Sequence, residues 1–255
     1  MFLLREILHH SNILTAANMK ARYRKTLAGF AWVILNPLIM YCIQVYVFKN
    51  VLKVTMENYP LFLLGGLLPW AFISTSIDMA APVFVNSSTI LKSLKIHPVV
   101  LVSSQVSDNA VSYLTAFLVV LLSVFFGGIK THLSLLLLPI PLSLLLLGTF
   151  SFSWSLAIIN VFYRDTRFIV GMLLNVLFYL TPIFYSENSV PLEARKLVGL
   201  NPIYTLIKPV RLAIHQYEFE TFSKACLQSL LVVFIALSLA IILWKKLRNE
   251  LYFRL

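Results

Sequence analysis

Long apolar stretches separated by short polar segments dominate the pattern of this chain. A helix needs roughly 20 apolar residues to cross about 30 Å of hydrocarbon, and six stretches approach or exceed that length. The sequence therefore predicts an all-α, polytopic membrane protein that forms a single transmembrane domain over residues 1–255. The six predicted spans are Ala28–Phe48, Tyr59–Ala81, Val99–Phe126, Leu133–Ile159, Phe168–Tyr185 and Ala225–Trp244.

Two of these spans carry irregularities. Polar residues crowd the first half of the third span, from Ser103 to Asn109, whereas Leu114 to Phe126 is apolar. The fourth span holds Pro139 and Pro141 near its start. Proline removes a backbone donor and loosens a helix, so we expect a break there, with neighbouring helices or water satisfying the freed carbonyls.

The first residues predict a helix that lies along the membrane surface. Leu4, Ile7, Leu8, Ser11 and Leu14 fall near one face of a helix, and a basic run follows them. An amphipathic helix beside basic residues is typical of an element at the membrane interface. We therefore expect residues 1–26 to form an interface helix.

A second short helix is predicted between the second and third spans, within residues 83–98. Asn86 to Thr89 supplies four residues of the types favoured as N-caps, and the helix should end near Lys95, before Pro98. The segment is more apolar than a free loop. A helix lying on the membrane surface is the alternative interpretation.

The longest polar stretch lies between the fifth and sixth spans, within residues 186–224. Pro191–Leu200 and Thr205–Tyr217 both read as short helices, and Asn201-Pro202 marks the break between them. The second of these helices is too apolar for a plain surface loop, so we expect it to be buried.

The distribution of lysine and arginine predicts the orientation. Basic residues favour the cytoplasmic side of the membrane, and four of them precede the first span within a few positions. An even number of spans places both termini on the same side, which is then the cytoplasm. Of the 21 lysines and arginines, 13 fall inside: Arg5, Lys20, Arg22, Arg24, Lys25, Lys92, Lys95, Arg164, Arg167, Lys245, Lys246, Arg248 and Arg254.

The composition agrees with a membrane protein and needs no nucleic acid to explain its charge. Hydrophobic residues make up 59% of the chain and charged residues only 12%, against about 25% in soluble domains. The net charge of +11 comes from basic residues beside membrane helices, where they meet anionic lipid headgroups. Cys42 and Cys226 lie far apart in apolar runs and suggest no disulfide framework.

The sequence lacks the residue patterns that are typical of catalytic and nucleotide-binding sites. The eight glycines never form the pattern G-x-x-x-x-G-K-S/T of a nucleotide-binding loop, and the pattern G-x-S-x-G is missing. The five histidines are scattered, which argues against a metal site, and no cofactor is expected. Asp78 and Asp108 are the two carboxylates within predicted spans. We read Asp108 as a hydrogen-bonding group at a helix contact, and a role in ion coupling is the alternative.

Three stretches, in this order and spacing, carry a family resemblance. The first is Lys20-Ala21-Arg22-Tyr23-Arg24 with Gly29, Trp32 and Asn36-Pro37. The second is Asn160 to Asp165. The third is Phe178 to Tyr185, followed by Val190-Pro191, Asn201-Pro202 and Arg211. Over nearly the whole chain, the set resembles the permease subunit of polysaccharide ABC exporters, which move O-antigen, capsule or teichoic acid chains.

The resemblance implies a homodimer of six-span subunits in the bacterial inner membrane, with a separate nucleotide-binding ATPase and a lipid-linked glycan as substrate. It implies a coupling helix before Pro98 and two re-entrant gate helices on the outer side. In one respect the chain departs from the family, because Val99 stands where a basic residue often follows the proline. An exporter of drugs or small lipids and an ion-coupled transporter are the alternatives.

The resemblance also implies roles for particular residues. Aromatic rings would line the export path, since their faces stack on the apolar faces of sugar rings. The path residues are Tyr41, Phe48, Phe178, Tyr179, Phe184 and Tyr185. The residues implied to contact the ATPase are Ile90, Leu91, Lys92, Leu94 and Lys95. The interface-helix and motif residues are Arg22, Tyr23, Arg24, Trp32, Arg164 and Asp165, and the outer-gate residues are Pro191, Asn201, Pro202 and Arg211.

Overall fold

A computed structural model describes residues 2–23, 31–51, 53, 56, 58–93, 96–126, 133–215 and 217–254, and every regular element within them is a helix. The all-α prediction is confirmed. The elements are α1 (Phe2–Tyr23), α2 (Ala31–Tyr46), the π-helical η1 (Val47–Val51), α3 (Tyr59–Ala80), α4 (Val83–Asn86), α5 (Ser88–Ser93), α6 (Val99–Phe126), the 3-10 helix η2 (Leu133–Leu137), α7 (Pro139–Phe162), α8 (Thr166–Leu180), the 3-10 helix η3 (Glu187–Ser189), α9 (Leu192–Leu200), α10 (Pro202–Ile214) and α11 (Phe219–Arg254).

Four helical segments are long and apolar enough to cross a membrane. The other two predicted spans correspond to α2 and α8, which have 16 and 15 residues. At 1.5 Å per residue, α8 is about 22 Å long, short of the roughly 30 Å of a hydrocarbon core. The count of six spans therefore stays a prediction. The four long segments are Tyr59–Ala80, Val99–Leu122, Ser134–Phe162 and Phe219–Arg254.

The fourth predicted span is interrupted where its prolines lie. η2 ends at Leu137, and α7 then begins at Pro139. Proline is well suited to the first helical position, because its missing N–H would have no partner in the helix there. The expected break is confirmed.

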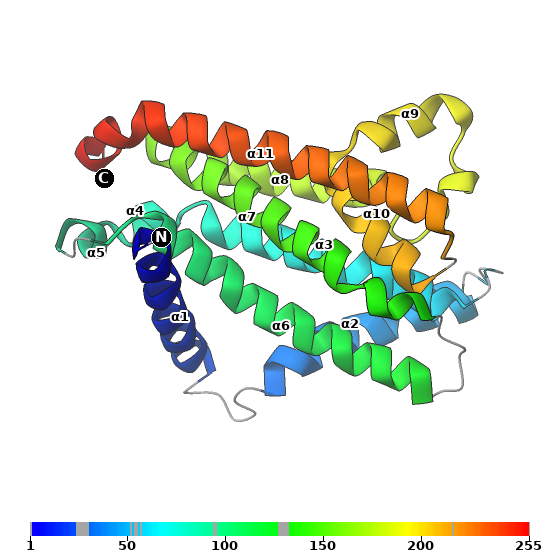
Figure 1. Ribbon diagram of the computed structural model, residues 1–255. Coiled ribbons are helices and arrows are strands. Elements are labelled where there is room, and N and C mark those ends of the chain that lie inside the picture. Colours follow the sequence, from blue (N-terminus) through cyan, green and yellow to red (C-terminus); the bar gives the residue numbers. More distant parts are fainter. Residues whose placement is uncertain are drawn as a thin grey trace.

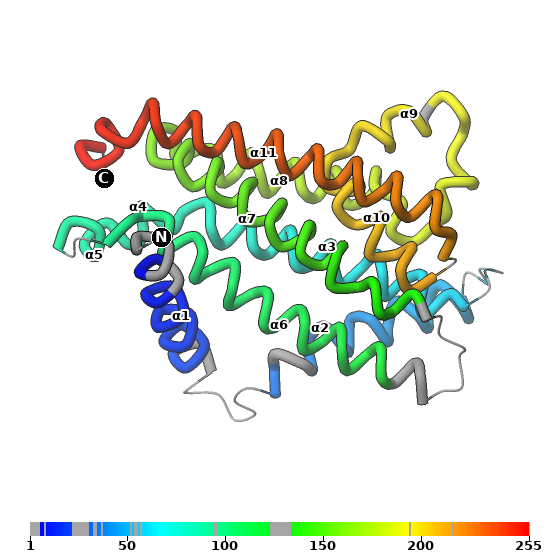
Figure 2. Tube along the Cα trace, in the orientation of Figure 1, coloured from blue at the N-terminus to red at the C-terminus, as the bar shows by residue number. Residues whose placement is uncertain are grey.

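The two chain termini lie at one end of the bundle together with α4 and α5, and α9 and α10 lie at the opposite end (Figure 1). We call these the terminal end and, after the gate helices that the family resemblance implies there, the gate end. The long helices α3, α6, α7 and α11 run between the two ends. Figure 2 follows the chain through the same arrangement, with α1 beside the start of α6.

Three glycines allow helix α10 to pack deeply into the gate end. A Cβ atom on Gly65 of α3 would lie 2.8 Å from the Cα of Arg211, and one on Gly148 of α7 would lie 2.6 Å from Leu206 Cδ1. Gly65, Gly66 and Gly148 thus let the side chains of α10 come close to the backbones of α3 and α7. Gly171 of α8 has no atom within 4 Å of its Cβ position, so no comparable close contact forms there among the described residues.

Candidate functional site

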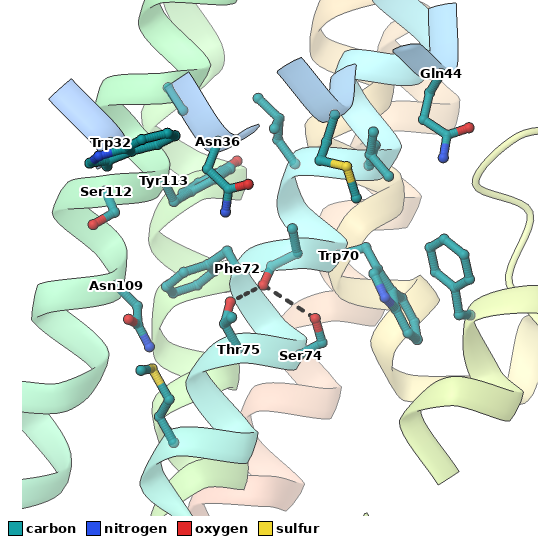
Figure 3. Close-up of a pocket in the computed structure, with 17 residues that line it drawn as sticks. Trp32, Asn36, Gln44, Trp70, Phe72, Ser74, Thr75, Asn109, Ser112 and Tyr113 are labelled. Carbon is teal, nitrogen blue, oxygen red and sulfur yellow. Dashed lines mark hydrogen bonds between the residues drawn. The ribbon is translucent and has the colours of Figure 1, made fainter. Parts of the chain in front are cut away.

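A groove lies between α2, α3 and α6, and we call it the α2–α3–α6 groove (Figure 3). Its volume is about 450 Å³, within the range of roughly 300–1,000 Å³ that is usual for small-molecule sites. The groove is open to the surface, and aromatic, hydroxyl and carboxamide side chains share its walls. The lining residues are Trp32, Asn36, Met40, Gln44, Leu67, Leu68, Trp70, Ala71, Phe72, Ser74, Thr75, Met79, Asn109, Ser112, Tyr113, Ala116 and Phe178.

Helix α2 contributes one wall through residues spaced four apart. Trp32, Asn36, Met40 and Gln44 therefore lie along one face of the helix. Trp32 keeps 48% of its surface exposed. This face alternates apolar and amide-bearing side chains, so it can contact both ring carbons and hydroxyl groups.

Helices α3 and α6 form the floor, where aromatic rings are fixed by packing. The rings of Phe72 and Tyr113 stack with their centroids 5.1 Å apart, and Trp70 lies 5.6 Å from Phe178. The Asn109 amide donates a hydrogen bond of 3.3 Å to Ser76 Oγ across the two helices. Because these groups are held by their neighbours, the groove is largely pre-formed.

Two hydroxyl groups in the groove are already engaged. Ser74 Oγ and Thr75 Oγ1 both donate to the Ala71 carbonyl, as the dashed lines of Figure 3 mark. A hydroxyl that donates its proton inward still has lone pairs that can accept. The groove thus offers hydrogen-bond acceptors, amide donors and ring faces together, which suits a ligand rich in both hydroxyl and C–H groups.

Of the six predicted path residues, only Phe178 lines this groove. Phe48 and Phe184 form a second aromatic cluster with Phe178 at the gate end. The Phe48 and Phe184 rings are parallel within 3° at 4.7 Å, and Phe184 meets Phe178 edge-on at 5.3 Å. Three rings that come from η1, from α8 and from the segment after α8 therefore lie together. Residues that line one path would have to be close in this way.

The three tyrosines of the same set have different surroundings. Tyr41 is buried, and its hydroxyl donates to the Pro60 carbonyl over 2.8 Å, so it ties α2 to α3. Tyr179 is 75% exposed on α8, and the Tyr185 hydroxyl donates to the Tyr179 carbonyl. Tyr41 is thus placed as a packing residue, and Tyr179 faces away from the bundle.

The two short helices predicted between the fifth and sixth spans are present as α9 and α10, although α10 begins at Pro202 rather than Thr205 and ends at Ile214 rather than Tyr217. Asn201 fixes the corner between them. The Asn201 side-chain oxygen accepts from the backbone N–H groups of Ile203 and Tyr204 and so caps α10, whose first residue is Pro202. Its amide nitrogen donates to Thr181 Oγ1 at 2.8 Å. One side chain therefore starts α10 and attaches it to the end of α8. Pro191 stands just before α9 and is exposed.

Arg211 is buried in the same region, with 6% of its surface exposed. Its guanidinium donates to the carbonyls of Pro182 at 2.6 Å and Ile183 at 3.3 Å, and it stacks 4.2 Å above the Phe62 ring. A Cβ atom on Gly66 would lie 2.2 Å from Arg211 Nη2, so glycine leaves the space that the guanidinium fills. These contacts link α10 to α3 and to the segment after α8.

The short helix predicted before Pro98 appears as α5, and the residues predicted to couple it to an ATPase differ in exposure. Leu91 is buried at 4% exposure and anchors α5 on the bundle. Ile90 and Lys92 are exposed and face away from it. Leu94 and Lys95 lie outside the described residues. The N-cap prediction for Asn86 to Thr89 is consistent with the start of α5 at Ser88.

The predicted interface helix is α1, and it packs against the start of α6 through small hydroxyl residues. Ser103 Oγ donates to Ser11 Oγ at 2.9 Å, and Thr15 Oγ1 lies 3.3 Å from the Ser104 carbonyl. Arg24 lies outside the described residues, as do the side chains of Arg22 and Tyr23. Ser103 and Ser104, in the polar first half of the third predicted span, thus contact α1, whereas Asn109 of the same half contacts α3.

The remaining motif residues lie at the turn between α7 and α8, at the terminal end. Arg164 and Asp165 are exposed there. The two carboxylates singled out in the sequence differ in environment, because Asp108 is fully buried on α6 whereas Asp78 is exposed on α3. Within the described part of the chain, no group of three histidine, cysteine or acidic side chains is placed to hold a metal ion.

The bundle of long apolar helices defines a membrane-embedded, multi-pass protein, and comparison with known proteins identifies its family. Residues 10–215 match the ABC-2 type transporter family, and the chain belongs to that family. It is 30% identical over 196 residues to the O-antigen export system permease protein RfbA of Klebsiella pneumoniae, covering 76% of each chain. The Myxococcus xanthus protein of the same name is 29% identical over 222 residues, or 85% of each chain. The polysialic acid transport protein KpsM of Escherichia coli is 20% identical over 242 residues, covering 87% of this chain and 88% of that one.

Several groove residues were not found by reasoning from the sequence. Trp70, Phe72 and Tyr113 lie inside long apolar runs, where an aromatic residue looks the same whether it faces a groove, the core or lipid. Gln44 carried a signal, since it continues the four-residue spacing from Trp32 and is a polar group within an apolar span. That spacing could have identified the α2 wall.

Proposed function

We propose that this chain is the transmembrane subunit of an ATP-driven exporter that moves a lipid-linked polysaccharide out of the cytoplasm. Two lines of argument support the proposal. Relatives that match most of the chain carry the names of O-antigen and polysialic acid export proteins. The α2–α3–α6 groove has the mixture of ring faces and amides that a sugar chain needs.

The groove is the observation that carries the proposal. Sugar rings present apolar C–H faces, which stack on aromatic rings, and hydroxyl groups, which exchange hydrogen bonds with carboxamides. Trp32, Trp70 and Phe178 supply ring faces, and Asn36 and Gln44 supply amides along one wall. We assign the groove to the export path together with the adjoining cluster of Phe48 and Phe184. Tyr41 and Tyr185 would support this path through their hydrogen bonds to the Pro60 and Tyr179 carbonyls, and the exposed Tyr179 would support it through the contact of its ring with Phe178.

In the proposed exporter, ATP is hydrolysed by a separate ATPase subunit. The exposed Ile90 and Lys92 of α5 would contact that subunit, while the buried Leu91 holds α5 to the bundle. Helix α1 and the exposed Arg164 and Asp165 lie at the same end of the molecule and would extend the contact (Figure 1). Residues 83–98 would thus form the coupling loop.

The proposed assembly is a homodimer in the bacterial inner membrane, with both termini in the cytoplasm. Two-fold symmetric dimers are the commonest oligomers. Helix α8 supports this assembly, because most of its apolar side chains are exposed in the single chain and Gly171 leaves open space beside it. Residues 186–224, with Pro191, Asn201, Pro202 and Arg211, would form the outer gate.

The function is tested by deleting the gene and measuring surface and intracellular lipid-linked glycan after complementation with variants. Trp32→Ala and Asn36→Ala remove exposed groove side chains, and Phe234→Ala, which is exposed on α11 away from the groove, is the matched control. The wild-type gene should restore surface glycan. Each groove variant should reduce the export rate about two- to tenfold, the effect of losing one aromatic contact in Trp32→Ala or one hydrogen bond in Asn36→Ala.

Other outcomes would contradict the proposal. Normal surface glycan in the deletion strain, with no second exporter present, would exclude polysaccharide export and favour a drug or small-lipid exporter. Activity that survives without any ATPase but is lost in Asp108→Asn would favour an ion-coupled transporter. An equal loss in Phe234→Ala and Trp32→Ala would remove the groove from the path.

A further inference from the structure

Four aromatic side chains form a continuous row that begins at the terminal end and reaches the middle of α7, outside the α2–α3–α6 groove. His97, which follows α5, lies with its ring centroid 5.0 Å from that of Trp244 on α11. Trp244 lies 6.4 Å from Trp154 on α7, and Trp154 lies 5.8 Å from Phe150. The row therefore runs from the corner between α5 and α6 across α11 and into α7.

His97 also starts helix α6. Its Nδ1 atom accepts from the Val99 backbone N–H at 3.3 Å, and its carbonyl accepts from the Val100 N–H at 2.9 Å. Pro98 is buried between them. A neutral imidazole is needed for Nδ1 to accept, and burial lowers the pKa of His97, which favours that form. The ring is thus held in place by the helix that it caps.

The far end of the row is embedded in the two helices that pack against each other most extensively, α7 and α11. Trp154 is buried on α7, and Trp244 closes the apolar part of α11, just before Lys245 and Lys246. Close-packed side chains resist compression, so a displacement at one end of such a row is passed to the other. The ring of Pro98 fixes its backbone φ angle, so the corner between α5 and α6 can bend less.

We propose that His97 is a positioning residue that transmits movement of α5 to α7 and α11 through the contact of its ring with Trp244. The proposal rests on the proposed function, in which an ATPase subunit moves α5. Neither ring needs to touch ATP or the glycan. In the absence of the contact, α5 could move while α11 stays in place, and ATP hydrolysis would be uncoupled from export.

Two substitutions at His97 separate the ring contact from the helix cap. His97→Asn keeps a capping acceptor and loses the ring, whereas His97→Phe keeps a ring and loses the acceptor. Trp244→Leu removes the other side of the contact, and Phe219→Asn, at the opposite end of α11, is the control for an exposed aromatic residue. The permease–ATPase complex is reconstituted in vesicles, and exported glycan is measured per ATP hydrolysed.

We expect this ratio to fall at least about threefold in His97→Asn and in Trp244→Leu, and to stay within about twofold of wild type in His97→Phe and Phe219→Asn. The double variant His97→Asn/Trp244→Leu should be no worse than either single variant, because both remove the same contact. A loss in His97→Phe with retention in His97→Asn would reduce His97 to a helix cap and overturn the proposal. Wild-type ratios in every variant would also overturn it.

A second measurement does not depend on the glycan. Spin labels are placed at Ile43→Cys on α2 and Phe234→Cys on α11, both exposed positions, in a background with Cys42→Ser and Cys226→Ala. Labelled copies are diluted with unlabelled ones, and the distance between the labels is measured before and after ATP is added to the complex. The ATP-dependent change should be present with His97 or His97→Phe and lost with His97→Asn.

The two measurements separate this inference from the proposed function. A distance change that depends on the ring, in a complex that exports no glycan, would support transmission and contradict polysaccharide export. Glycan export together with a distance change that persists in His97→Asn would support polysaccharide export and contradict transmission through the His97 ring. A chain that binds no ATPase would overturn both.

Discussion

At the scale of single residues, the gate end depends on how Arg211 is accommodated. A buried guanidinium is costly unless its donors are satisfied. Here two carbonyls of the segment after α8 accept from it, and the face of Phe62 lies 4.2 Å away. Gly66 supplies the space. The same side chain thus holds three parts of the chain together, which explains why an arginine lies inside a bundle of apolar helices.

Replacing Gly66 by alanine should destabilise the protein. The new methyl group would overlap the Arg211 guanidinium and displace it from the Pro182 and Ile183 carbonyls. Loss of a buried charged hydrogen bond costs about 1–3 kcal/mol, so the free energy of unfolding should fall by about that amount. Thermal unfolding of the purified protein in detergent measures the change.

Gly199→Ala is the control for this substitution. Gly199 is also helical, on α9, but no atom lies within 4 Å of its Cβ position. The unfolding temperature of Gly199→Ala should match that of wild type or exceed it slightly, because alanine has a higher helix propensity than glycine. If Gly66→Ala and Gly199→Ala lowered the unfolding temperature equally, the effect of Gly66→Ala would not come from the space that Gly66 leaves for Arg211.

At the scale of elements, α5 is a short helix whose faces have different roles. It has only six residues, and isolated helices of that length are not stable in water. Leu91 is its buried residue, so its position depends on that anchor. The exposed Ile90 and Lys92 are then presented to the outside at a fixed orientation, as a contact surface for another subunit requires.

We expect substitutions on the two faces of α5 to have distinct effects. Ile90→Ala and Lys92→Ala should leave the unfolding temperature unchanged and reduce co-purification of the ATPase subunit. Leu91→Ala should lower the unfolding temperature, since truncating a buried leucine costs about 2–5 kcal/mol. Pull-down of the ATPase and thermal unfolding, measured on the same three variants, test this division. A stability loss in Lys92→Ala, or none in Leu91→Ala, would contradict it.

At the scale of the whole molecule, the arrangement of the ends places strong limits on topology. Both termini and α5 lie at the terminal end, and α9 lies at the gate end (Figure 1). A membrane that crosses the long helices must therefore separate α9 from the termini. The basic residues at positions 245, 246 and 248 follow the apolar part of α11 and favour the cytoplasmic side for the terminal end.

Cysteine labelling tests this orientation. Phe253→Cys at the terminal end and Leu197→Cys on α9 replace side chains that are 92% and 71% exposed. In a background with Cys42→Ser and Cys226→Ala, an impermeant maleimide added to intact spheroplasts should label position 197 and spare position 253. Inverted vesicles should give the opposite result. Labelling of both positions from one side would contradict the predicted topology.

The sequence alone established the class of the fold and most of its elements. Runs of about 20 apolar residues predict helices because no other regular segment satisfies its own backbone groups in lipid. The break before Pro139, the corner at Asn201-Pro202 and the short helix before Pro98 were also predictable, because proline and cap residues act locally. The gate-end aromatic cluster was predicted in part, through Phe48, Phe178 and Phe184.

Tertiary structure alone decided which way the side chains of an apolar helix face. Tyr41 and Gln44 lie on the same predicted span, yet Tyr41 packs on Pro60 whereas Gln44 faces the groove. In a soluble protein, polar residues mark the side of a helix that faces solvent. In a membrane, lipid and core both accept apolar residues, so the sequence does not show which side of a helix faces which. The contacts of His97 with Trp244 and of Arg211 with Gly66 join residues more than a hundred positions apart, and only the packed bundle brings them together.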